Sequence, residues 1–168
     1  MTDQPQGLQR LLHMIPGYSG YQAMEQRRDA DKALRTYLAQ QFAGERQTLE
    51  RLAQQVASQG RIEYSERIEQ INQALTLFMA RLDSAPRGYT GWFDAAPMTT
   101  ADLDQIYEFD AKLADSVPLL REQLAYAMTT FESGENFEDA LHSLRHFVDN
   151  LNTQFDARQS FLARGRRD

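Results

Sequence analysis

The chain of 168 residues contains no cysteine. Disulfides, thiol nucleophiles, iron–sulfur clusters and zinc sites with thiolate ligands are therefore excluded. No run of about 18 apolar residues exists, so we expect no membrane-spanning helix. The first ten residues show no signal-peptide pattern, and a cytoplasmic protein is the expectation. With 42% hydrophobic residues, the length suits one domain with a substantial core.

Glycine and proline are also scarce, with nine and five residues, and most of them cluster at a few points. Between these points the apolar residues recur with a helical period, and no strand-like alternation is present. The sequence therefore predicts an all-α fold in a single domain, 1–168. The expected elements are a short amphipathic helix within an N-terminal segment 1–16, a long helix from Ser19 to Gly60, helices over 62–84, 99–133 and 136–164, and a frayed tail at 165–168.

The long helices pair convincingly if the chain reverses at Gly60 and at Gly134. Phe42 then faces Phe78, and Phe131 faces Phe137, with apolar residues opposite one another along both hairpins. Two antiparallel hairpins predict a four-helix bundle. Pro118 lies inside the segment 99–133, but the apolar stripe keeps its phase across it, which favours one kinked helix over two.

Polar residues at core positions suggest two structural ion pairs. The second hairpin places Asp110 opposite Arg158, and Arg27 lies four residues before Asp31, within reach on one helix face. The long loop between the hairpins carries Tyr89, Trp92 and Phe93, either as a crossover or as a cap over the bundle end. It is expected to fold onto the start of the first long helix, as a small aromatic core or as a pocket near Trp92.

Residues for catalysis or metal binding are few. A ferritin-like di-iron site needs two Glu-x-x-His motifs, and only Asp139-x-x-His142 comes close. His142 and His146 lie about 160° from the apolar stripe, so they should face solvent, and His13 is far away in the sequence. Phosphate-binding loops and nucleophile motifs are absent. We therefore assign no catalytic, metal or cofactor site, and a metalloprotein is a disfavoured alternative.

The N-terminal segment is the best candidate for an interaction, because it is apolar with one charged residue, Arg10, within 8–15. It could dock on its own bundle, lie on a membrane surface or enter a partner's groove. Residues 99–140 carry ten acidic and two basic side chains, a net charge of −8, which disfavours nucleic acid. The candidate partner-binding residues are Leu8, Leu11, Leu12, Tyr18, Tyr21, Tyr89, Trp92 and Phe93.

These features favour a non-enzymatic helical bundle that mediates protein–protein interaction. The alternative is a bundle that binds a small molecule or cofactor near Trp92. No unbroken heptad demands self-association, so the oligomeric state stays open.

Four motifs together resemble a family of uncharacterised bacterial helical-bundle proteins, over most of residues 8–120. They are Ile15-Pro-Gly-Tyr-Ser-Gly-Tyr21, Arg27-Arg-Asp-Ala-Asp31, Gly88-Tyr-Thr-Gly-Trp-Phe-Asp94 and Tyr107-Glu-Phe-Asp110. Some members are encoded near membrane-scaffold proteins of the SPFH, or flotillin-like, class. The resemblance implies an accessory or adaptor role and assigns no catalytic residue.

Overall fold

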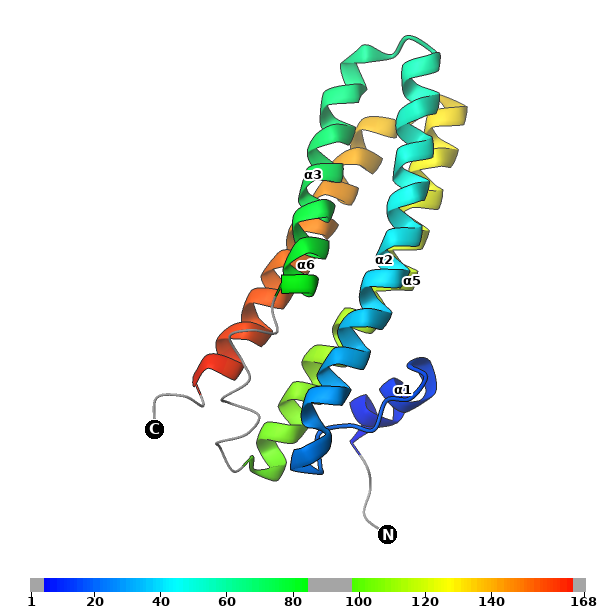
Figure 1. The fold of residues 1–168 in the computed structure, drawn as a ribbon. Coiled ribbons are helices and arrows are strands. Elements are labelled where there is room, and N and C mark those ends of the chain that lie inside the picture. The colour runs from blue at the N-terminus through cyan, green and yellow to red at the C-terminus, as the bar shows by residue number, and fades with distance from the viewer. Residues whose placement is uncertain (1–4, 85–97, 165–168) are drawn as a thin grey trace.

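The described part of the chain folds into helices (Figure 1). The computed structural model describes residues 5–84 and 98–164. Within these residues no strand occurs, and the predicted all-α fold is confirmed. The elements in chain order are α1 (Gln6–Met14), a 3₁₀ turn η1 (Met24–Gln26), α2 (Arg27–Ser58), α3 (Ile62–Ser84), α5 (Thr100–Ser133) and α6 (Phe137–Arg164).

Each long helix packs against two others. The sequence-adjacent pairs are α2 with α3 and α5 with α6, and the two hairpins meet where α2 packs on α5 and α3 packs on α6. The predicted register is present in both hairpins. The ring centroids of Phe42 and Phe78 are 4.9 Å apart, and those of Phe131 and Phe137 are 5.0 Å apart.

Local sequence signals explain where α5 begins and ends. Thr99 accepts a hydrogen bond from the Asp102 backbone N–H while the Asp102 carboxylate accepts one from the Thr99 N–H, a complete capping box. Gly134 ends the helix with a φ of 78°, a left-handed conformation that glycine adopts without steric cost. The helix is continuous across Pro118, as the stripe predicted.

The start of the first long helix differs from the prediction. We expected it at Ser19, but α2 begins at Arg27, and residues 15–23 form an irregular connection. Gly17 and Gly20 have positive φ values of 76°, which no helix accommodates. Because residues 15–23 are not helical, the connection places the Tyr21 side chain in the interior.

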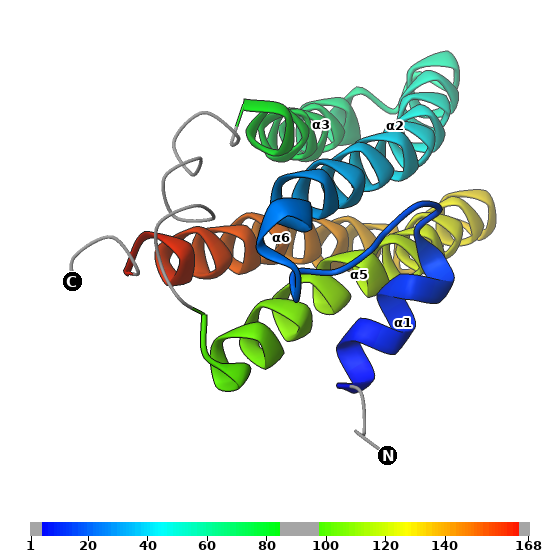
Figure 2. The ribbon, with the colours of Figure 1, turned by 60° about the horizontal axis from the view of Figure 1, so that its bottom comes forward.

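The N-terminal helix α1 lies outside the bundle and packs on α5 (Figure 2). Leu8 and Leu11 are buried there, and Arg10 forms an ion pair with Asp115 of α5. From α1 the connection crosses α5 to reach α2. Among the described residues, no helix has both the length and the apolar character needed to cross a lipid bilayer.

Candidate functional site

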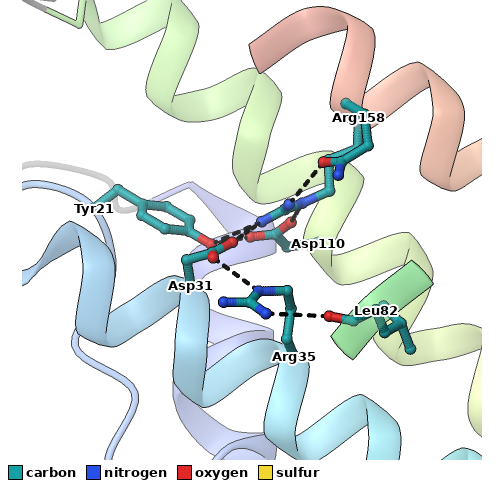
Figure 3. A network of polar contacts seen from close by, with 7 residues as sticks. Tyr21, Asp31, Arg35, Leu82, Asp110 and Arg158 are labelled. Carbon is teal, nitrogen blue, oxygen red and sulfur yellow. Dashed lines mark hydrogen bonds and ion pairs between the residues drawn. The ribbon is translucent and has the colours of Figure 1, made fainter. Parts of the chain in front are cut away.

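Charged and phenolic side chains from four parts of the chain meet at the end of the bundle where this connection crosses α5 (Figure 3). We call this group the polar cluster: Tyr21 from the connection, Asp31 and Arg35 from α2, Asp110 from α5 and Arg158 from α6. Arg158 is 1% exposed and Asp110 is fully buried. Charges at this depth are costly unless every one is paired, so the pairing decides what the cluster can do.

Arg158 lies at the centre of the polar cluster and contacts both acids. Its Nε donates to Oδ1 of Asp110 at 2.6 Å, and its Nη2 donates to Oδ1 of Asp31 at 2.7 Å. The same Nη2 lies 3.3 Å from the Tyr21 hydroxyl oxygen. One guanidinium therefore joins α6 to α5, to α2 and to the N-terminal connection.

The second oxygen of each carboxylate is also occupied. Oδ2 of Asp110 accepts a hydrogen bond from the Tyr21 hydroxyl at 2.5 Å, and Oδ2 of Asp31 accepts one from Arg35 Nε at 2.9 Å. Arg35 in turn donates to the carbonyl of Leu82 near the end of α3, at 3.1 Å. Two carboxylates and two guanidiniums thus balance in charge, and each of the four carboxylate oxygens has a partner.

The electrostatics keep Arg158 charged and Tyr21 neutral. Burial by itself would lower the pKa of Arg158, but the attraction of Asp110 and Asp31 outweighs it, and the pKa is raised well above its usual range. Burial, followed by the negative charge of Asp110, raises the pKa of Tyr21. For Asp110, burial raises the pKa against the attraction of Arg158. An arginine that stays charged and a tyrosine that stays neutral serve as structural partners, since proton transfer needs groups that titrate.

The backbone of Tyr21 is held as firmly as its side chain. Its N–H donates to the Tyr107 hydroxyl at 2.7 Å, and its carbonyl accepts from Arg27 Nε at 2.8 Å. The two tyrosine rings stack with centroids 5.5 Å apart. A Cβ at Gly20 would lie 2.8 Å from the Tyr107 hydroxyl oxygen, so only glycine permits this approach.

The structure confirms one predicted ion pair and corrects the other. Asp110 and Arg158 pair as the register of the second hairpin indicated. Arg27 does not pair with Asp31: it binds the Tyr21 carbonyl, while Arg158 and Arg35 hold Asp31. The sequence reasoning missed Arg35, although it lies four residues after Asp31 on the same helix face.

Most of the predicted partner-binding residues that the structure describes are buried, which corrects their expected role as a contact surface. Leu8, Leu11, Tyr18 and Tyr21 are at most 6% exposed, because α1 and the connection pack on α5 and the polar cluster. Of the candidates in the described ranges, Leu12 is exposed, at 41%. Tyr89, Trp92 and Phe93 lie outside the residues that the structure describes, and so does the proposed pocket near Trp92.

A hollow of about 340 Å³ lies between α2 and the start of the N-terminal connection, where Ile15 and Pro16 form part of its wall. We call it the α2 hollow. Ala33 and Tyr37 contribute further apolar surface. The remaining lining residues are Asp29, Lys32, Thr36 and Gln40.

No group of three or more histidine, aspartate or glutamate side chains in residues 5–84 and 98–164 is arranged to hold a metal ion. His142 and His146 are exposed, as expected from the helical pattern, and His13 is exposed as well. Comparisons of the chain with protein-family models, curated proteins and solved structures gave no match.

Proposed function

We propose that this chain is a non-enzymatic helical bundle that binds a partner protein in an accessory role. The internal saturation of the polar cluster supports this role. All four carboxylate oxygens of Asp31 and Asp110 accept bonds from side chains of the same chain. The cluster therefore offers a substrate no free carboxylate oxygen, and its effect is to hold the N-terminal connection in place.

The observation that carries the proposal is the α2 hollow next to this immobilised connection. Irregular segments held on a rigid scaffold are common binding surfaces, and a pre-ordered surface loses less entropy on association. Tyr21 pins the connection through its hydroxyl, its N–H and its carbonyl. The exposed Pro16, a few residues earlier, is thereby presented beside the half-buried Tyr37 of α2, and Ile15, which also lines the hollow, is buried.

The small-molecule alternative has less support in the described residues. Its two charged residues, Arg27 and Asp31, are engaged with the Tyr21 carbonyl and with two arginines. The resemblance to bacterial helical-bundle proteins also favours an adaptor, and it suggests a partner in a membrane-associated assembly.

A substitution that fills the α2 hollow tests the proposal. Thr36 is exposed and lines the hollow, so Thr36→Arg should obstruct it without disturbing the core. Gln47→Arg is the matched control, since Gln47 is exposed on the same face of α2 about three turns further along. Both variants and the parent are cross-linked in cells that produce the protein, and the captured proteins are quantified.

We expect a protein that cross-links to the parent and to Gln47→Arg but is lost with Thr36→Arg. Equal capture by all three chains would contradict the α2 hollow as the binding surface. If no protein cross-links to the parent chain or to either variant, the proposed function itself is contradicted.

A further inference from the structure

Two histidines in the first half of α6 line one hollow, about three to four helical turns before Arg158 of the polar cluster. His142 and His146 are four residues apart, which makes their side chains neighbours on a helix surface. Both are exposed, and both line a hollow of about 260 Å³ between α6 and α5, which we call the α5–α6 hollow. Its other lining residues are Gln123, Ser143, Phe147 and Asn150.

We propose that His142 and His146 chelate one zinc-class divalent ion in this hollow. Imidazole nitrogen is a preferred ligand of Zn²⁺, and two histidines separated by three residues on a helix are a spacing that zinc sites use. Because the helix holds both rings on one face, the second ligand binds without a further loss of chain entropy. The inference concerns a different face from the α2 hollow and does not depend on the proposed function.

Asn150 supplies the second shell that such a site needs. Its side-chain amide nitrogen, Nδ2, lies 3.3 Å from Nδ1 of His146. Ligating histidines donate their other ring N–H to an oxygen, which fixes the tautomer and the ring orientation. A 180° turn of this amide exchanges its nitrogen and oxygen, so that the oxygen accepts a hydrogen bond from Nδ1–H and Nε2 of His146 is free to bind the ion.

The site is open, because the described residues provide no third histidine, aspartate or glutamate placed to complete it. Water fills the remaining tetrahedral positions, in contrast to a closed structural zinc site. The positive charge of the nearby Arg145 is compensated by Asp149, because the Arg145 Nε lies 3.1 Å from both oxygens of that carboxylate. The net charge of −6 also favours a cation over an anion.

Calorimetric titration of the metal-free full chain with zinc chloride tests the site. We expect one ion per chain, and we expect His142→Ala and His146→Ala each to lower the affinity at least about tenfold, the lower end of what losing even an outer-shell partner costs. Asn150→Ala should also weaken binding. His13→Ala is the matched control, because His13 is equally exposed but lies in α1, and it should leave the affinity unchanged. Circular dichroism verifies that each variant folds.

Competition with magnesium and calcium chlorides completes the experiment. Hard cations prefer oxygen ligands, so neither should displace Zn²⁺ from two imidazoles. Displacement by Ca²⁺ would show that surface carboxylates hold the ion and would overturn the proposal. Undiminished zinc affinity in both α6 histidine variants, or no zinc binding by the parent chain, would overturn it as well.

Discussion

Arg158 shows how strongly one buried residue can depend on its surroundings. Its guanidinium pairs with two acids that are at most 7% exposed. The net gain from a buried ion pair is small, because desolvation offsets much of the attraction. Losing one member is far more costly, because the remaining charges stay buried without compensation.

Replacing Arg158 by methionine should therefore destabilise the fold by about 3–5 kcal/mol, since Asp31 and Asp110 each lose a partner in the interior. Urea denaturation gives the change in unfolding free energy. Arg145→Met is the control: it removes an exposed pair with Asp149 and should cost less than about 1 kcal/mol. Similar losses in both variants would contradict a structural role for the polar cluster.

The sequence predicted the pair of Asp110 and Arg158 but not the contact between Asp31 and Arg158, and the difference has a physical reason. Asp110 and Arg158 belong to one hairpin, whose register follows from its turn and its apolar stripes. Asp31 belongs to the other hairpin, and its distance to Arg158 depends on how the two hairpins pack. Helical periodicity describes one element at a time, so it contains no information on that packing.

At the scale of elements, the burial of α1 changes what its leucines do. Leu11 is fully buried and Leu12 is 41% exposed. Leu11→Ala should cost about 2–5 kcal/mol, as large-to-small changes in a packed core do. Leu12→Ala should lie within about 0.5 kcal/mol of the parent. Thermal or urea unfolding measures both, and a Leu11 variant as stable as the parent would mean that α1 does not dock in solution.

Two glycines should respond to alanine in opposite directions. Gly44 lies inside α2 with nothing near its Cβ position, so Gly44→Ala should stabilise the fold by about 1 kcal/mol through helix propensity. Gly20→Ala should destabilise it, because φ is positive and the new methyl would collide with Tyr107 and Leu8. Comparing the two unfolding midpoints checks both signs, and a stabilised Gly20 variant would rule out the close approach described above.

The elements themselves were largely predictable from local signals. The capping box at Thr99 and the turn at Gly134 bound α5 as the sequence indicated. The start of α2 was not predictable. Ser19 and Gln22, three residues apart, fit a capping box, but this local pattern competes with contacts that Tyr21 makes to α5, nearly ninety positions away. Tertiary hydrogen bonds outweighed the local preference there.

For the whole molecule, the buried tyrosines predict alkaline sensitivity. Burial raises the pKa of Tyr18, Tyr21 and Tyr107 above the ordinary value of 10.0. A raised folded-state pKa means that the unfolded chain loses protons first, so this contribution to stability is present below pH 10.0 and is lost as the pH rises further. Tyrosinate absorbance should therefore rise together with the loss of helical signal.

Tyr18 allows this expectation to be checked cleanly. Tyr18→Phe keeps the edge-to-face packing of its ring on Tyr21 and removes one ionisable group. The pH midpoint of alkaline unfolding should move upward. Tyr126→Phe, at a position that is 51% exposed, should leave it in place. An unchanged midpoint in the Tyr18 variant would show that its ionisation is not linked to unfolding.

The reach of Arg158 along the chain has a kinetic consequence. Its partners Asp31 and Tyr21 lie 127 and 137 residues away, whereas its contact with Asp110 and the apolar contacts within each hairpin are more local. Contacts between distant residues form late, when the hairpins have already assembled. Weakening them should accelerate unfolding and leave the folding rate nearly unchanged. The polar cluster then determines the lifetime of the native state and not the speed with which it is reached.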